Sequence, residues 1–341
     1  MNSKAQKIQF GPTDQLVLLG GGKLLREVSL VAIELGIPIK VITSQRYAIE
    51  IIDSLSLQDF LKKHDCSLIV VESLLKDEVE KFISLSPNTV ALSIGAPWIF
   101  SEKTIANLFG NKLLNLHGTR LPHNRGAGGM SWQIMSGNRF GMCCIHLVDG
   151  RVDTGPIVHL EEFIYPAKLR IPLEYEDYYI KRNLIFLREF IKEISAKPKE
   201  FAVIRQPEYL STYWPRLNSN INSFIDWSLD GREVELFINA FDDPYPGAKT
   251  FWNKTSVRIK KGSLSPQEGF SHSFKNGLVF RKGPSWLCIV VSNATLIIEE
   301  IRSEEGEDLF DVVRVGDRLH TPYSYLDIAK ERVTLGPRGW L

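Results

Sequence analysis

The first part of the chain alternates short apolar runs with segments of helical periodicity, and this alternation limits the folds open to it. The apolar runs cover residues 16–19, 38–43, 67–71 and 90–94, and the segments between them include helix-like stretches at 24–35 and 77–83. Neighbouring parallel strands need long crossover connections, which are usually helices. The sequence therefore predicts an α/β, Rossmann-like domain with a parallel sheet covered by helices on both faces.

A glycine run, Gly20-Gly21-Gly22, follows the first apolar stretch and raises the question of a nucleotide cofactor. Leu25 stands where a dinucleotide-binding fingerprint has its third glycine, and no acidic residue ends the second strand. Leu24, rather than Ser or Thr, follows Lys23, so a phosphate-binding loop is also incomplete. We expect a tight turn instead, in which the amides of Gly21 and Gly22 approach a substrate phosphate.

Length and charge narrow the classes of protein further. At 341 residues the chain is long for a single core, so two domains are expected. With 41 basic and 40 acidic side chains the net charge is +1, which argues against a nucleic-acid partner on electrostatic grounds. No apolar run approaches a membrane span, and no signal peptide is recognisable. The four cysteines fit no metal or disulfide spacing, so we expect a cytoplasmic protein without a metal.

Three polar residues, Asn115, His117 and Asp153, are predicted to meet in one site. The apolar residues 112–114 suggest a buried strand that leads into Asn115 and His117, whose side chains project to the same side. A second strand over 142–148 leads to Asp153. Groups just beyond the carboxyl ends of strands line the ligand crevice of an open α/β sheet.

These residue types suit acyl or formyl transfer to an amine. His117 can take a proton from the amine, Asn115 can donate to the developing oxyanion, and Asp153 can stabilise the imidazolium. No nucleophilic Ser or Cys is required. Each residue alone has an ordinary reading, as a surface or capping group or as part of a turn; their joint occurrence in this order favours a site.

The segment from Asn115 to Gly155 resembles the formyltransferase family that uses 10-formyltetrahydrofolate. The matching positions are Asn115, His117, Leu121, Pro122, Arg125, Gly126, Asp153, Thr154 and Gly155. The chain departs from the family at Thr119, usually Ser, and at Arg120, usually Leu. The resemblance implies that Asn115, His117 and Asp153 are catalytic and that 10-formyltetrahydrofolate is the cosubstrate.

Residues 213–217, 225–228 and 240–250 resemble the linker and second domain of the longer family members. This implies a catalytic domain over 1–205, a linker and small β-barrel related to the oligonucleotide-binding (OB) fold over 206–305, and a C-terminal extension over 306–341. The extension docks as a helix or stays partly loose. The patterns add a long helix over 172–194, a helix over 233–241 and several short strands between 247 and 301.

The resemblance also implies two loops around the pterin and a set of substrate contacts. The pterin loops comprise Gly95, Ala96, Pro97, Trp98, Ile99, Asp149, Gly150, Arg151 and Val152. In the alternative interpretation, Trp98 and Phe100 start the next helix, packed on the sheet. Expected substrate contacts are Thr119, Arg120 and Arg125, although Arg125 can instead brace its loop.

The expected acceptor is an amino sugar carried on a nucleoside diphosphate. The tRNA-modifying members carry a basic insertion after the second strand, whereas residues 44–50 here contain one arginine, Arg46. The alternatives are a methionyl-tRNA formyltransferase, a 10-formyltetrahydrofolate hydrolase, and a non-catalytic protein that binds folate or a nucleotide sugar. The sequence leaves a homodimer open.

Overall fold

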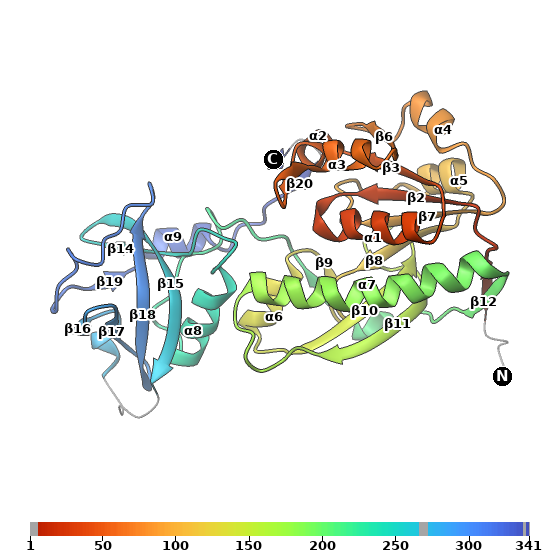
Figure 1. Ribbon diagram of the computed structural model, residues 1–341. Helices are drawn as coiled ribbons and strands as arrows, with labels where there is room; N and C mark the ends of the chain where they lie inside the picture. The colour runs from red at the N-terminus through yellow and green to blue at the C-terminus, as the bar shows by residue number, and fades with distance from the viewer. Residues whose placement is uncertain (1–5, 266–271, 337–338, 341) are drawn as a thin grey trace.

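The computed structural model describes residues 6–265, 272–336 and 339–340 and contains two large sheets, each packed against helices (Figure 1). The first sheet has seven strands in the order β11-β10-β8-β7-β2-β3-β6. In chain order these strands are β2 Gln15–Gly20, β3 Ile39–Thr43, β6 Ser67–Val70, β7 Thr89–Ile94, β8 Leu113–His117, β10 Phe140–Leu147 and β11 Ile157–Ile164.

The prediction of a wholly parallel sheet is wrong for its last two strands. Strands β8, β7, β2, β3 and β6 run parallel, but β10 is antiparallel to β8, and β11 to β10. The connection over 118–139 stays at the edge where β8 ends, so β10 starts beside that end and runs back along β8. The pairing sets His146 directly opposite Asn115.

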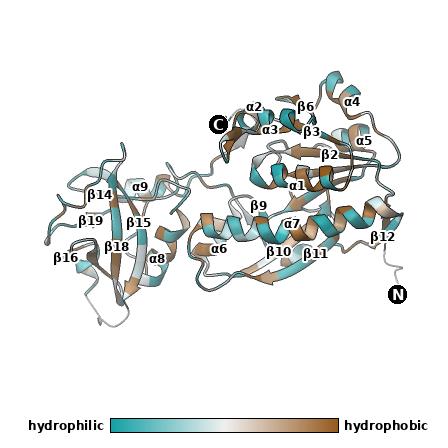
Figure 2. Cartoon of the chain, in the orientation of Figure 1, coloured by the Kyte–Doolittle hydropathy of each residue, from teal (hydrophilic) through white to brown (hydrophobic). Residues whose placement is uncertain are grey.

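Helices cover both faces of the first sheet, as predicted. Helices α1 Gly22–Glu34, α3 Leu57–Lys63 and α7 Pro172–Ala196 pack on one face, and α4 Asp77–Ile83 and α5 Glu102–Phe109 pack on the other. Hydrophobic and hydrophilic residues alternate along α7 (Figure 2), as expected for a helix with one buried face. The ends follow local chemistry: the Ser101 side chain accepts from the Thr104 amide at the start of α5, and Gly110 ends the helix with φ +53°.

Short elements surround the first sheet. Strand β1 Lys7–Phe10 pairs with β12 Lys199–Ala202, and β4 Ile51–Ile52 pairs with β5 Leu55–Ser56. Helix α2 Gln45–Ala48 follows β3, and α6 Gly129–Met135 precedes β10. Strand β13 Tyr213–Trp214 pairs in parallel with β9 Arg125–Gly126, just after the 3-10 turn η1 Glu208–Leu210. The chain leaving the first unit is therefore hydrogen-bonded to the segment that follows His117.

The second sheet is antiparallel and curled, with six strands in the order β16-β17-β18-β15-β14-β19. These strands are β14 Ala248–Trp252, β15 Thr255–Ser265, β16 Val279–Lys282, β17 Leu287–Val291, β18 Ala294–Ser303 and β19 Leu319–His320, with the turn η2 Ser273–Lys275 between β15 and β16. Strand β19 lies beyond residue 305, so the segment predicted as an extension supplies an edge of this sheet. Helix α8 Gly231–Ala240 contacts both α6 and β15, which makes the apolar core continuous between the units. The relation of this sheet to the OB fold stays a prediction.

The last segment of the chain crosses back from the second unit to the first. Helix α9 Tyr323–Ile328 packs through Leu326 on Phe224 and Phe251. Strands β20 Leu335–Gly336 and β21 Gly339–Trp340 then pair in antiparallel orientation. Among the described residues, no helix is both long and apolar enough to span a bilayer.

Candidate active site

A cavity of about 510 Å³ opens at the carboxyl ends of β7 and β8. Its lining includes Asn115, His117 and Asp153, the three residues that the sequence places in one site. Asn115 and His117 lie on β8, and Asp153 lies in the loop between β10 and β11. A concave site of this size suits a small organic ligand.

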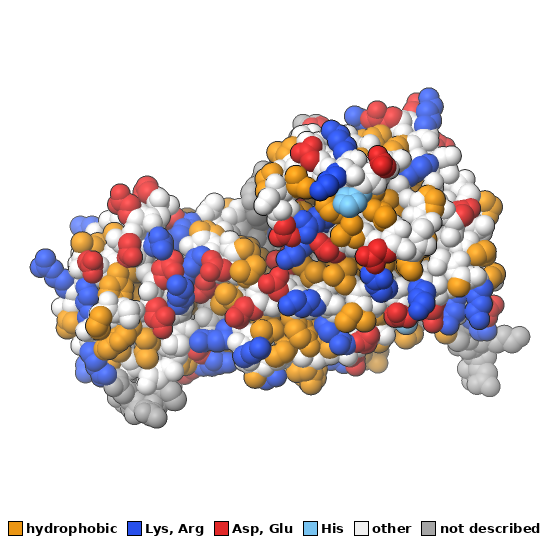
Figure 3. Space-filling model, in the orientation of Figure 1, with side chains coloured by type: hydrophobic (Ala, Val, Ile, Leu, Met, Phe, Trp, Pro, Cys, Tyr) orange, Lys and Arg blue, Asp and Glu red, His pale blue; other side chains and the backbone are white. Residues whose placement is uncertain are grey.

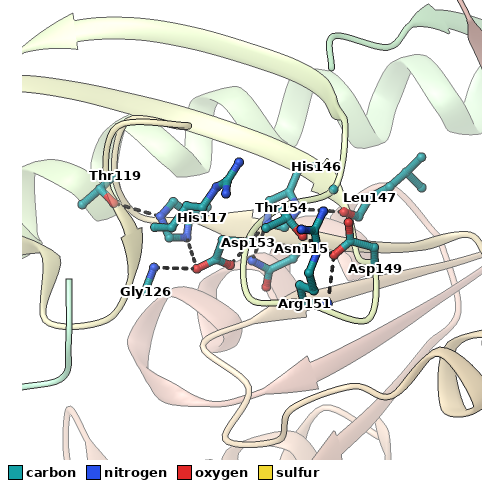
Figure 4. Close-up of polar contacts among 12 residues, drawn as sticks. Asn115, His117, Thr119, Gly126, His146, Leu147, Asp149, Arg151, Asp153 and Thr154 are labelled. Carbon is teal, nitrogen blue, oxygen red and sulfur yellow. Dashed lines mark hydrogen bonds and ion pairs between the residues drawn. The ribbon is translucent and has the colours of Figure 1, made fainter. Parts of the chain in front are cut away.

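His117 and Asp153 face one another across this cavity (Figure 4). The distance between His117 Nδ1 and Asp153 Oδ2 is 3.5 Å, and both side chains are largely buried. The Nε2 atom of His117 lies 2.7 Å from the Asn124 carbonyl oxygen and 2.9 Å from Thr119 Oγ1. Because a carbonyl oxygen only accepts, Nε2 carries the hydrogen in the neutral ring. The basic nitrogen is therefore Nδ1, on the side of Asp153.

The surroundings shift the pKa values of this pair in opposite directions. Burial of His117 disfavours its charged form, but the Asp153 carboxylate and the Asn124 carbonyl outweigh burial and raise the pKa of the ring above its usual value. Burial also opposes ionisation of Asp153, yet the charge and hydrogen bond of the neighbouring His117 ring hold the pKa of that carboxyl far below its usual range. Asp153 is thus a carboxylate beside a ring that gains a proton readily.

His146 is a member of this constellation that the sequence analysis missed. Its Nε2 atom lies 3.0 Å from Asn115 Nδ2 and 3.5 Å from Asp153 Oδ1, and its Nδ1 atom lies 2.7 Å from the Leu147 carbonyl oxygen. Nδ1 must donate to that carbonyl, so Nε2 accepts from the Asn115 amide. The amide orientation is thereby fixed, and its second N–H is left for a ligand. The only signal in the sequence is a histidine within an otherwise apolar strand.

Two close backbone approaches shape the loop that carries Asp153. Asp153 has φ +54°, in the left-handed region that Asp tolerates better than most residues, and its Oδ2 atom accepts from the Gly126 amide at 2.9 Å. A Cβ atom on Gly126 would lie 2.2 Å from the Trp214 carbonyl oxygen, and one on Gly155 would lie 1.7 Å from that of Leu147. Only glycine allows these strands to pass at such distances.

Arg125 lies outside the cavity lining and braces the same loop. Its buried guanidinium donates to Gln206 Oε1 at 3.1 Å and pairs with Glu208 at 3.0 Å. Gln206 Nε2 in turn donates to the carbonyl oxygens of Asp153, at 2.9 Å, and Gly155, at 2.7 Å. The geometry matches the alternative role considered for Arg125.

The other expected substrate contacts divide between the cavity and the surface. Thr119 lines the cavity and contacts the His117 ring, whereas Arg120 lies outside it and pairs with Glu162 at 3.3 Å. Gly21 and Gly22 also lie outside the cavity lining. The site of a Gly21 Cβ atom is taken by the Tyr47 ring, 2.3 Å away, and the Gly22 amide opposes the rise that burial causes in the pKa of Glu50.

Both expected pterin loops border the cavity. Residues 95–99 line it, as do Asp149, Arg151 and Val152. Gly150 does not, because its free side faces Glu102. Ile99 is 83% exposed and Val152 40% exposed, so the cavity presents apolar side chains to solvent.

The alternative interpretation of Trp98 and Phe100 holds in part. Phe100 is buried against the sheet just before α5, and Trp98 packs against the same apolar cluster and donates from Nε1 to the Glu72 carbonyl oxygen at 3.0 Å, yet both residues also line the cavity.

Further lining residues come from distant segments that sequence reasoning did not connect to the site. They are Arg46 and Tyr47 of α2, Tyr213 and Arg216 of the segment joining the units, and Arg332, Val333 and Thr334 of the last segment. One donor atom each of His117, His146 and Asp153 lies within 4.8 Å of the others, a spacing that could also hold a metal ion. His146 Nε2 already accepts a hydrogen bond from the Asn115 amide, so no metal ion is needed to explain its position.

The comparisons with known proteins agree on one family. A family profile described as "Formyl transferase" matches residues 32–164, and one described as "Formyl transferase, C-terminal domain" matches residues 219–309. The methionyl-tRNA formyltransferase of Acetivibrio thermocellus is 25% identical over 57% of this chain, and that of Akkermansia muciniphila is 30% identical over 56%. In each case the alignment covers 60% of the relative's own length.

Solved structures of similar fold include WlaRD, a sugar 3N-formyltransferase, with a TM-score of 0.64 and 16% identity over 85% of this chain and 98% of that one. The N-formyltransferase from Helicobacter canadensis has a TM-score of 0.64 and 17% identity over 83% and 98% of the two chains. The methionyl-tRNA formyltransferase from Clostridium thermocellum has a TM-score of 0.51 and 16% identity over 74% and 95%. At these identities the likeness concerns the fold. With both units matched by profiles of one family, the chain belongs to the formyltransferase family.

Proposed function

We propose that this protein transfers a formyl group from 10-formyltetrahydrofolate to the amine of a nucleotide-linked amino sugar. The observation that carries the proposal is the hydrogen-bonded group of Asn115, His117, His146 and Asp153 in a cavity that also has apolar, solvent-facing side chains. The polar group suits attack of an amine on a formyl carbon. The exposed Ile99 and Val152 suit the faces of a flat ring.

Each polar side chain has a defined task in this reaction. As the amine attacks, the free N–H of Asn115 donates to the formyl oxygen, where negative charge develops, a contact worth roughly 10² to 10³ in rate. His117 Nδ1 takes the proton from the amine, and the Asp153 carboxylate stabilises the resulting imidazolium. The new bond joins the formyl carbon to the amine nitrogen, the bond to the folate nitrogen breaks, and His117 returns the proton to that folate nitrogen.

Two observations favour a small acceptor over tRNA. The segment after β3 is the short helix α2 and the hairpin of β4 and β5, with no basic insertion. On the face shown in Figure 3, basic and acidic side chains are interspersed, whereas a tRNA-binding surface would carry a basic stripe.

The solved structures of similar fold add support by analogy. The Helicobacter canadensis enzyme was solved with folinic acid and dTDP-3-aminofucose, and WlaRD with dTDP and 5-N-formyl-THF. The methionyl-tRNA formyltransferases among the sequence relatives make charged initiator tRNA the second candidate acceptor.

The test measures tetrahydrofolate release from 10-formyltetrahydrofolate with a panel of nucleotide-linked amino sugars, with charged initiator tRNA, and with no amine. We expect turnover with an amino sugar that is lost in Asn115→Ala, His117→Ala and Asp153→Ala. His123→Asn is the matched control, because His123 follows the same motif but is half-buried, bonds to the Leu210 carbonyl and does not line the cavity. Turnover only with tRNA would refute the choice of acceptor, and formate release without any amine would identify a hydrolase.

A further inference from the structure

Three arginines from distant parts of the chain line the catalytic cavity: Arg46 of α2, Arg216 just after β13, and Arg332 between α9 and β20. Two tyrosines lie among them. The Arg46 guanidinium lies 4.4 Å from the Tyr47 ring centre, and that of Arg332 lies 5.9 Å from the Tyr213 ring centre. Both rings also line the cavity.

Within the described part of the chain, none of the three arginines forms an ion pair with a carboxylate. Arg46 donates to the Tyr47 hydroxyl, while its Nε atom is buried without a hydrogen-bond partner. Glu50 acts on Arg46 only from beyond ion-pair distance. Desolvation lowers the pKa of Arg216, and the positive charge of Arg46 lowers it further. Arg125, Arg170 and Arg258, in contrast, each pair with a carboxylate.

The positions of these arginines are fixed by structure around them. Asn222 Nδ2 donates to the carbonyl oxygens of Ala329, at 2.9 Å, and Glu331, at 3.0 Å, and Val333 is buried, so the backbone is held on both sides of Arg332. Trp214, next to the chain turn that carries Arg216, is held by the pairing of β13 with β9. Neighbouring like charges held in a cavity favour an anionic ligand, because an anion removes their mutual repulsion.

The start of helix α1, where the sequence predicted a phosphate, offers no such place. The Gly22 amide already acts on the Glu50 carboxylate and favours its charged form, and Tyr47 packs against Gly21. Three acidic groups, Glu50, Glu176 and Asp177, lie at this end of the helix, together with Lys23, which pairs with Asp177 at 3.5 Å. A second anion there would meet negative charge.

We propose that Arg46, Arg216 and Arg332 bind the diphosphate of the acceptor, and that the last segment of the chain thereby determines which acceptors are used. This inference rests on the proposed function for the identity of the acceptor. Guanidinium groups bind phosphate oxygens through paired, charge-assisted hydrogen bonds, and three of them supply enough positive charge to balance the two negative charges of a sugar-linked diphosphate. Arg332 makes residues 329–334 part of the substrate site.

The test is calorimetric binding of dTDP, UDP and GDP, of the matching nucleosides, and of 5-formyltetrahydrofolate to the full-length protein. We expect Arg46→Gln, Arg216→Gln and Arg332→Gln each to weaken binding of the preferred nucleoside diphosphate about tenfold or more, the loss of one charge-assisted contact. Binding of the nucleoside and of 5-formyltetrahydrofolate should be unchanged. Arg332→Lys should keep part of the affinity, and Arg314→Gln, an exposed arginine outside the cavity, should keep all of it.

Weaker binding of 5-formyltetrahydrofolate with unchanged nucleoside diphosphate binding would overturn the inference, because the arginines would then serve the glutamate carboxylates of folate. Unchanged binding of both ligands in all three variants would also overturn it, as would a wild-type protein that binds no nucleoside diphosphate. Arginine-dependent nucleoside diphosphate binding without formylation of any amino sugar would support this inference while refuting the proposed function.

Discussion

Replacement of His146 by leucine is expected to lower kcat by roughly 2- to 13-fold, because the ring acts on the reaction through Asn115. Its Nε2 atom accepts one N–H of the Asn115 amide at 3.0 Å and so directs the other N–H into the cavity. A net hydrogen bond is worth about 0.5 to 1.5 kcal/mol, and 1.36 kcal/mol corresponds to a tenfold change in rate. Asn115→Ala removes the donor itself and should cost roughly 10² to 10³.

The double variant distinguishes this role from an independent one. If His146 works only by orienting Asn115, the pair His146→Leu with Asn115→Ala should be no slower than Asn115→Ala alone. His146→Gln should recover part of the loss, because a glutamine side chain can also accept from the amide. The assay is single-turnover formylation at saturating substrate, which separates chemistry from binding.

Folding controls belong to the same experiment. His146 is 2% exposed, and its loss leaves the partly buried Leu147 carbonyl without its donor, so His146→Leu should also lower stability by about 1 to 3 kcal/mol. Assays well below the measured Tm remove this effect. His159→Leu is the matched control, since His159 packs on Phe186 with ring centres 4.8 Å apart, outside the cavity lining. A double variant slower than Asn115→Ala by the full His146→Leu factor would refute the reasoning.

Three other outcomes follow from the site. The carboxylate of Asp153 raises the pKa of His117 against the opposing effect of burial. Asp153→Asn should therefore lower that pKa, move the acidic limb of the kcat/KM profile to lower pH and reduce the rate by roughly 10² to 10⁴. An acidic limb that stays in place would show that another group titrates there. Gln206→Leu removes two hydrogen bonds to the loop that carries Asp153. In steady-state kinetics this variant should lower kcat more than it raises KM. An effect on KM alone would contradict the role of Gln206 in bracing the loop. Gly155→Ala would bring a Cβ atom to 1.7 Å from the Leu147 carbonyl oxygen and should destabilise the protein by about 1 to 3 kcal/mol, as measured by denaturant unfolding. An unchanged midpoint of the unfolding transition would show that the loop can move to accommodate the added methyl group.

The parallel strands and their helices were predictable because apolar periodicity is a local property of the chain. Segment 77–83 is α4 with the same bounds, and 67–71 and 90–94 correspond to β6 and β7 within one residue at either end. Strand direction depends instead on where a connection crosses the sheet. The antiparallel entry of β10 was therefore missed, and with it the pairing of His146 with Asn115.

The residues of the site show the same difference between what is local in the chain and what depends on tertiary packing. Asn115, His117 and Asp153 could be placed together because strand ends and short spacing bring them to one edge of the sheet. Only tertiary packing of α2, the joining segment and the last segment brings together Arg46, Arg216 and Arg332. A local sequence pattern cannot predict such packing. The surroundings of Gly21 and Gly22 were hidden for a similar reason, because Glu50 and Tyr47 reach the start of α1 from beyond the next strand.

The pairing of β13 with β9 means that the catalytic unit is not a self-sufficient module. Strand β13 belongs to the segment joining the two units, yet its partner Gly126 supplies the amide that binds the Asp153 carboxylate. A protein cut after residue 205 would retain the seven-stranded sheet but lose Gln206, Glu208 and β13 in one step. Recombination between relatives would consequently have to exchange this joining segment together with the first unit. A second unit could be exchanged during evolution only if the crossover point in the chain lies beyond Trp214.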